Sequence, residues 1–151
     1  MTRRAVALLL LIVVAALGGL RADEVAQHDL CVEGLGYLAS RETIRFEAAS
    51  STLPGRHDAL IDDIANLMLQ CPNSRLHIEG HTDNRGDPDE NLALSTARAQ
   101  AVGDALATRG IAGDRLRVEG FGGSQPVADN DTRDGRRKNR RIALRFERDA
   151  R

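Results

Sequence analysis

Tryptophan is absent from this chain of 151 residues, and aromatic side chains make up only 3% of it. Sites that bind bases or sugars by stacking depend on aromatic rings, so the composition argues against a site of that kind. Internal repeats and low-complexity stretches are also absent. Apolar residues account for 42% and charged residues for 28%, which is ordinary for a globular protein. The length suits one domain with a real core and is short for two.

Long hydrophobic runs are absent except at the N-terminus, where residues 5–20 carry no charge and follow the basic start MTRR. A helix of this length would extend roughly 24 Å, short of the ~30 Å hydrocarbon core of a membrane. The pattern predicts a secretory signal peptide over residues 1–22. Cleavage after Gly18 fits the preference for small residues better than cleavage after Ala22, and an uncleaved signal anchor is the alternative. The cleaved signal peptide and the uncleaved anchor both predict export of the remaining chain.

Export would leave the protein mildly acidic. Removing residues 1–22 takes away three arginines and no acid, which leaves 18 basic against 22 acidic residues and a net charge of −4. Such a charge disfavours general nucleic-acid binding. The arginine-rich run at residues 133–145 is an apparent exception, but Arg141 and Arg145 alternate with apolar residues, as on the solvated face of a strand. This patch could instead attract acidic glycans or anionic lipid headgroups.

Only two cysteines are present, Cys31 and Cys71. In an oxidising compartment such a pair predicts one disulfide, worth about 4 kcal/mol for a loop of this length. Two buried thiols are the alternative. A catalytic cysteine is disfavoured because no histidine is obviously placed to activate either thiol. The residues before Cys31 are not a lipobox, so a lipoprotein anchor is not expected.

Hydrophobic periodicity predicts alternating strands and helices. Helices are expected at residues 54–70 and 88–109, where Pro54 and Pro88 suit the first turn and Asp87 suits the N-cap. Residues 122–138 are expected to form a polar loop. The four predicted strands have alternating apolar residues and the sequences TIRFE, RLHIEG, RLRVEGFG and RRIALRFE. The βαβαββ order predicts an α/β fold, a two-layer sandwich with a mixed sheet and helices on one face.

Arg98 lies on the apolar half of the second predicted helix, two turns from Asn91. A guanidinium there is costly unless it is paired and hydrogen-bonded. The nearest candidate partner is Asp83, which follows Thr82 in the loop after the second strand. One interpretation is an internal Asp83–Arg98 salt bridge that serves packing alone. The other holds the two charges apart, so that Asp83 binds an ammonium group and Arg98 a carboxylate. The ligand would then carry the zwitterionic end of an amino acid.

Four motifs resemble the OmpA C-terminal-like domain family, which is shared with peptidoglycan-associated lipoproteins and flagellar motor stator proteins. The motifs are GHTDNRG, NLALSTARAQAV, GFGGSQPVADN and GRRKNRRI. The resemblance covers about residues 44–146 and implies a binding domain at 44–148 behind a lead-in segment at 23–43. It further implies non-covalent binding of peptidoglycan through the meso-diaminopimelate of the stem peptide, without enzymatic activity or a cofactor.

The resemblance also implies roles for individual residues. Asp83 would take the ammonium group of diaminopimelate and Arg98 its carboxylate. Ala49 occupies a position that is often polar in the family, where Ser50 or Ser51 could substitute. Further positions that match the family's pocket are Thr82, Asn91, Leu94 and Arg140. The expected location is the periplasm, in association with the cell wall, with a membrane anchor, an outer-membrane association or other envelope partners left open.

A periplasmic hydrolase acting on cell-wall material is the enzymatic alternative. Asp83 and Glu79 could form a carboxylate pair, but an exposed strand residue is the simpler interpretation of Glu79. The chain contains no GxSxG, HExxH or glycine-rich phosphate loop. A metal site is not predicted, because the acidic loop before Pro88 does not match an EF-hand. Metal binding by His77 and His81 is also disfavoured, since they lie four apart on a strand and His77 faces outward.

Overall fold

A computed structural model describes residues 29–40 and 43–148, so the predicted export segment lies outside the described residues. The structure contains a helix at residues 29–40 and the elements η1 (Gly55–His57), α2 (Asp58–Gln70), β1 (Ser74–His81), α3 (Pro88–Ala107), η2 (Gly113–Arg115), β2 (Leu116–Gly120), α4 (Arg133–Asn139) and β3 (Arg141–Arg148). Among these described elements, no helix is both long and apolar enough to cross a membrane.

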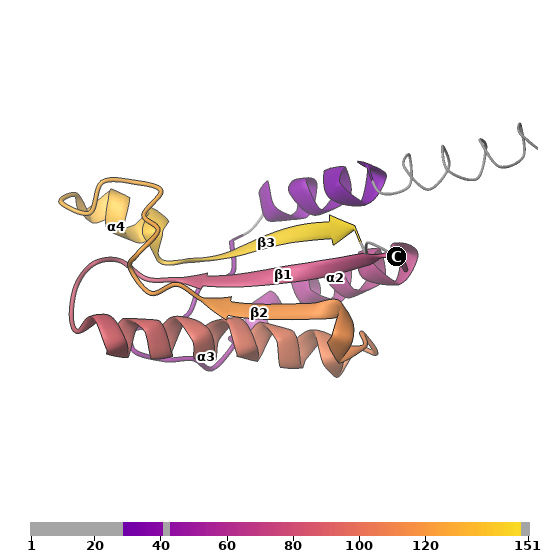
Figure 1. The fold of residues 1–151 in the computed structure, drawn as a ribbon, viewed down its shortest axis with the longest axis horizontal. Helices are drawn as coiled ribbons and strands as arrows, with labels where there is room; N and C mark the ends of the chain where they lie inside the picture. The colour runs from indigo at the N-terminus through magenta and orange to yellow at the C-terminus, as the bar shows by residue number, and fades with distance from the viewer. Residues whose placement is uncertain (1–28, 41–42, 149–151) are drawn as a thin grey trace, which may run out of the picture.

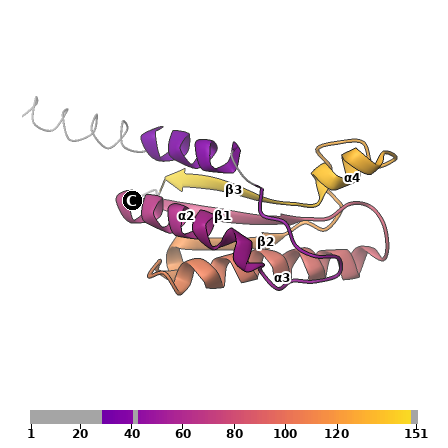
Figure 2. The same ribbon diagram turned by 180° about the vertical axis from the view of Figure 1, so that it is seen from behind.

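The described strands form one mixed sheet in the order β2-β1-β3. Strand β1 pairs in parallel with β2 and antiparallel with β3, and Leu76 at its centre lies opposite Leu116 and Phe146. In Figure 1 the strands lie side by side with α3 along the β2 edge, and Figure 2 shows α2 against the same sheet from behind. Leu76 and Ile78 are fully buried under these helices. The predicted two-layer α/β fold with a mixed sheet is confirmed.

The prediction of a first strand, with the sequence TIRFE, is wrong. Residues 43–47 have no strand assigned, although Ile44 is buried and Phe46 half-buried as the alternation predicted. The ring nitrogen Nε2 of His57 lies 3.1 Å from both the backbone nitrogen and the backbone oxygen of Arg45. A histidine side chain, not a neighbouring strand, therefore meets the backbone at this position.

The predicted loop at residues 122–138 contains the short helix α4, which is a second correction. Thr132 caps this helix by accepting a hydrogen bond from the backbone of Gly135 at 2.9 Å. At its other end the buried Asn139 side chain accepts from the backbones of Val127 and Ala128 and donates to Ala128. The helix RDGRRKN contains no apolar residue, so hydrophobic periodicity could not have found it.

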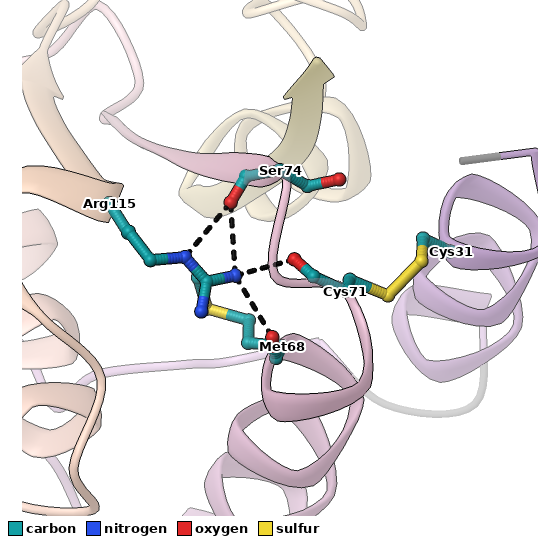
Figure 3. Close-up of a disulfide and its surroundings, with 5 residues drawn as sticks. All are labelled: Cys31, Met68, Cys71, Ser74 and Arg115. Atoms are coloured by element: carbon teal, nitrogen blue, oxygen red, sulfur yellow. Dashed lines mark hydrogen bonds between the residues drawn. A yellow bond between two sulfur atoms is a disulfide. The ribbon is translucent and has the colours of Figure 1, made fainter. Parts of the chain in front are cut away.

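The lead-in segment is tied to the core by the predicted disulfide, which is confirmed. Cys31 in the helix at residues 29–40 is bonded to Cys71, directly after α2. Both cysteines are buried, together with Leu35 on the same helix. Figure 3 shows the disulfide beside Arg115, which donates to three backbone carbonyl oxygens around the end of α2.

Two glycines let α3 lie directly on the ends of the strands. A Cβ atom on Gly80 of β1 would come within 2.0 Å of the carbonyl oxygen of Ser95. A Cβ atom on Gly120 of β2 would come within 2.1 Å of the hydroxyl of Thr96. Both distances are far below van der Waals contact. The close approach holds the middle of α3, and with it Arg98, beside the loops that follow β1 and β2.

Candidate functional site

A cavity of about 470 Å³ opens beside the C-terminal end of β1. Its wall is built from the segment before η1, the end of β1, the first half of α3 and the junction of α4 with β3. Four of the six predicted ligand-binding residues lie on this wall: Thr82, Leu94, Arg98 and Arg140. Because these residues come from three separate stretches of sequence, the loop after β1, α3 and the end of α4, only the folded chain brings them together.

The guanidinium of Arg98 is held in place by backbone carbonyls. Its Nε donates to the oxygen of Ser50 at 2.8 Å and its Nη2 to the oxygen of Glu47 at 2.9 Å. The group also lies 5.4 Å from the centre of the Phe46 ring, within cation–π range. Only 7% of Arg98 is exposed, and burial, helped by the nearby Arg140, holds its pKa below the ordinary value.

Asp83 is bound by neighbours other than Arg98. One of its oxygens accepts from the backbone of Arg85 at 3.0 Å, and the other accepts from Nη1 of Arg140 at 2.6 Å. Asp83 is 8% exposed and does not itself lie on the cavity wall, whereas Arg140 does. The internal Asp83–Arg98 salt bridge is not formed, because Arg98 has no carboxylate within ion-pair distance in the described chain.

The loop between β1 and α3 is fixed by its own hydrogen bonds. Thr82 donates from its hydroxyl to the carbonyl of Asp83, and its backbone nitrogen donates to Gly122. Asn91 donates to the carbonyl of Arg85 at 2.7 Å. Asn91 lies on a neighbouring groove of about 550 Å³ between the start of α3 with the loop before it and the segment at residues 120–124, not on the wall of the first cavity. The structure therefore separates Asn91 from the other predicted residues.

Ala49 lies on the cavity wall in a left-handed backbone conformation, with φ of 51°. It is the third residue of a turn that the backbone of Ser50 closes onto Glu47 at 3.2 Å. The carbonyls of this turn are the ones that Arg98 binds. The hydroxyl of Ser50 accepts from the backbone of Thr52. The turn thus presents carbonyls to Arg98 while the methyl group of Ala49 lines the cavity.

The sequence analysis considered His81 for a metal site alone and did not assign it to the ligand pocket, yet it also lies on the cavity wall. It is 2% exposed and stacks on Phe121 with ring centres 5.3 Å apart. Neither ring nitrogen has a hydrogen-bond partner among the described residues. Burial, and secondarily the charge of Arg141, lowers the pKa of His81 to about 4, against an opposing effect of Glu79. The imidazole is therefore neutral at pH 7. The signal in the sequence that could have identified His81 as a pocket residue is its position directly before Thr82, which was predicted to line the pocket.

Three further arginines of the wall were not assigned to the site from sequence: Arg45, Arg137 and Arg141. Together with Arg98 and Arg140 they give the cavity a cationic wall suited to carboxylates. Within the described residues, no group of three or more histidine, cysteine, aspartate or glutamate side chains could hold a metal ion.

Comparison with known proteins places this fold and site in a family. A model of the OmpA family matches residues 45–140, which is more than half of the chain. The chain therefore belongs to the OmpA family, as its four motifs predicted.

Two curated relatives and one solved structure illustrate the similarity. The peptidoglycan-binding protein ArfA of Mycobacterium tuberculosis is 39% identical over 95 residues, which cover 63% of this chain and 29% of ArfA. The outer-membrane lipoprotein YfiB of Pseudomonas aeruginosa is 36% identical over 83% of this chain and 77% of its own. The peptidoglycan-associated lipoprotein of Burkholderia pseudomallei is 28% identical with a TM-score of 0.67, covering 73% of this chain and 93% of that one. The chain thus spans less than a third of ArfA.

Proposed function

We propose that this protein binds peptidoglycan non-covalently in the cell envelope, by holding the zwitterionic end of meso-diaminopimelate in the arginine-lined cavity. The observation that carries the proposal is the state of Arg98. Its guanidinium is nearly buried on the cavity wall, and within the described part of the chain only its Nε and Nη2 have hydrogen-bond partners, both of them uncharged carbonyls. An arginine has five N–H donors. The remaining donors of Arg98 are available to a carboxylate in the cavity.

Asp83 is the proposed partner of the ligand's ammonium group. Its contact with Arg140 does not prevent this, because the Arg140 side chain is 47% exposed and can shift toward solvent while the carboxylate, at 12%, stays in place. Thr82 and Leu94 complete the wall, and we propose that they contact the ligand backbone. Asn91, which binds Arg85 and lies on the adjacent groove, would act by fixing the loop.

The proposed role is binding without catalysis. The carboxylate pair considered for a hydrolase is occupied, because Asp83 binds Arg140 and Glu79 is ion-paired with Arg145 at 3.1 Å. ArfA carries peptidoglycan binding in its name and YfiB an outer-membrane location, which supports a binding domain in the periplasm. Residues 1–22 would then direct export, either cleaved or retained as an anchor.

The test is a pulldown with two types of sacculi, containing either meso-diaminopimelate or lysine at the third stem position. Lysine keeps an ammonium group and lacks the terminal carboxylate, so binding should be far weaker. Asp83→Ala and Arg98→Ala should each reduce binding to diaminopimelate sacculi by about 30-fold or more, since truncating one partner of a desolvated charged contact costs about 2–5 kcal/mol. Arg98→Lys should not restore binding, because an ammonium group cannot form the two parallel hydrogen bonds that a guanidinium makes to a carboxylate.

The matched control is Arg133→Ala, which removes an arginine of α4 that does not line the cavity. A melting curve accompanies every variant, because Arg98 also holds the turn at residues 47–50. Equal binding of the wild-type protein to both sacculi, or full binding by folded Asp83→Ala and Arg98→Ala, would refute the proposal. Release of soluble muropeptides from the sacculi would favour the hydrolase instead.

A further inference from the structure

The cavity carries more positive charge than a zwitterion can balance. Carboxylates of the described chain pair with two of its five lining arginines, since Arg140 binds Asp83 at 2.6 Å and Arg137 lies 3.4 Å from Asp134. For the other three, the described residues offer no carboxylate within 4.0 Å: Arg45, Arg98 and Arg141.

Glu47, the acidic residue among those that line the cavity, does not offset this excess of positive charge. Glu47 turns its carboxylate to Arg56, at 3.1 Å on the outer surface. A diaminopimelate end, as in the proposed function, brings one carboxylate for Arg98 and one ammonium for Asp83, and so adds no net charge. Arg45 and Arg141 would remain without an ion-pair partner within 4.0 Å among the described residues, although Glu79 offsets part of the charge of Arg141 from a longer distance. Like charges in a partly desolvated site repel one another, so a ligand with one more carboxylate would bind more favourably.

Arg141 is the better placed of the two for a ligand. It begins β3, is half-buried, and lies beside the unpartnered ring of His81. Among the described residues, its guanidinium donates only to the backbone oxygens of Gln125 and Asn139, at 3.3–3.4 Å. Hydrogen bonds of this length are at the weak end of the normal range. The donors of Arg141 can therefore turn to an anion in the cavity with little loss.

We propose that Arg141, assisted by Arg45, binds a second carboxylate of the peptidoglycan stem, and that the cavity thereby selects stems in which this carboxylate is free. In a diaminopimelate stem the glutamate that precedes the diamino acid is joined through its side chain, so its α-carboxylate is free unless it has been amidated. Where the stem continues past the diamino acid, the second carboxyl group of diaminopimelate is in a peptide bond, and the glutamate α-carboxylate is then the nearest further carboxylate to the zwitterion. This inference rests on the proposed function and adds a preference for non-amidated stems.

The experiment compares two synthetic tetrapeptides by calorimetry: L-alanyl-γ-D-glutamyl-meso-diaminopimelyl-D-alanine amide, in which the second carboxyl group of the diamino acid is in a peptide bond, and the same peptide with the glutamate α-carboxylate amidated. The wild-type chain should bind the free acid about tenfold more tightly, the scale of one charge-assisted hydrogen-bonded contact. Arg141→Gln should remove most of this preference and Arg45→Gln part of it, because each loss of affinity should be larger for the free acid than for the amidated peptide. Arg133→Gln makes the same charge change on α4 away from the wall and should keep the preference.

The outcomes separate the two proposals. Equal wild-type affinity for both peptides, with diaminopimelate-dependent binding to sacculi intact, would overturn this inference and leave the proposed function standing. Failure to bind either peptide or the sacculi would overturn both. If Arg141→Gln unfolds, the wild-type preference and its weakening with added salt still decide the matter. A loss of binding to phosphatidylglycerol vesicles in Arg141→Gln, with the peptide preference unchanged, would assign these arginines to lipid headgroups and overturn the inference.

Discussion

Arg115 shows how much of the scaffold depends on one side chain. It donates to the carbonyl oxygens of Met68, Cys71 and Ser74 at 2.6–3.1 Å, where α2 ends and the chain enters β1 (Figure 3). The last carbonyls of a helix have no partner within the helix. A planar guanidinium reaches several of them at once, and its positive charge suits the C-terminal end of the helix.

Arg115→Ala should therefore lower the free energy of unfolding by about 2–3 kcal/mol, the scale of hydrogen bonds from a charged donor. Arg115→Lys should recover only part of this loss, because an ammonium group cannot donate to several carbonyl oxygens in the planar arrangement of a guanidinium. Urea denaturation measures both. Arg117→Ala, two residues further along, is the control, since that side chain is 64% exposed and should matter little. Equal stability of the Arg115→Ala and Arg117→Ala variants would contradict this account.

His81 makes stability depend on pH. Its pKa is lowered to about 4 in the folded protein, mainly by burial and then by Arg141, with Glu79 opposing. The unfolded value is about 6.5, so between these values the unfolded chain binds more protons. The contribution of a neutral His81 is thus fully present above pH ~6.5 and is lost as the pH falls toward ~4, with a total of about 3 kcal/mol.

Replacing the ring should remove this dependence. His81→Phe keeps an aromatic ring for the stack on Phe121 and cannot titrate. Unfolding free energies of the wild-type and variant proteins, measured from pH 7 to pH 4, should diverge as the pH falls, with the variant losing less. Parallel curves would mean that His81 does not carry this part of the acid sensitivity.

At the scale of elements, the contact between α3 and the sheet sets the position of the candidate site. The helix carries Arg98 and Leu94, and it can approach β1 and β2 only because Gly80 and Gly120 have no side chain there. Any displacement of α3 would move Arg98 relative to the carbonyls of Glu47 and Ser50.

Gly120→Ala should lower the free energy of unfolding by about 1–3 kcal/mol, the usual cost of overpacking. The added methyl group would lie 2.1 Å from the hydroxyl of Thr96 and 2.5 Å from its backbone nitrogen. Gly113→Ala is the matched control, because no atom lies within 4 Å of a Cβ at that position. Thermal denaturation compares the two. A Gly120→Ala protein as stable as Gly113→Ala would mean that the helix shifts without cost.

At the scale of the whole molecule, the disulfide joins the lead-in helix at residues 29–40 to the domain (Figure 3). The two cysteines are 40 residues apart. Replacing both with serine should lower the free energy of unfolding by about 4 kcal/mol on the chain-entropy model. The candidate cavity is built without either cysteine, so binding to sacculi should persist at temperatures where the variant is folded.

Limited proteolysis shows which part of the chain loses stability when the disulfide is removed. The helix at residues 29–40 should become susceptible to cleavage first, since Cys31 and Leu35 are its buried residues. Reduction of the wild-type protein should reproduce the effect, and a Ser40→Ala variant with the disulfide intact should not. Uniform susceptibility along the chain after reduction would show that the disulfide supports the whole domain.

Much of the fold could be predicted because it depends on local patterns. The apolar periodicity of α2 and α3 and the alternation in β1 follow from which side chains are buried, as Ile64, Val102 and Ile78 illustrate. The segment at residues 43–47 was mispredicted because alternation identifies its buried side chains but not the partner of its backbone. That partner is His57, which lies twelve residues further along the chain.

The sequence by itself determined the family, the disulfide pairing, the order of the main elements and the presence of a buried arginine that requires partners. Only the tertiary structure decided what those partners are. Arg98 binds carbonyls 48 and 51 residues away, and Asp83 binds Arg140, 57 residues away. Helical phase and strand alternation give the face on which a side chain lies, but contacts over such separations depend on how helices and strands pack. The same packing places Asn91 on a separate groove and gathers Arg45 and Arg141 at the cavity.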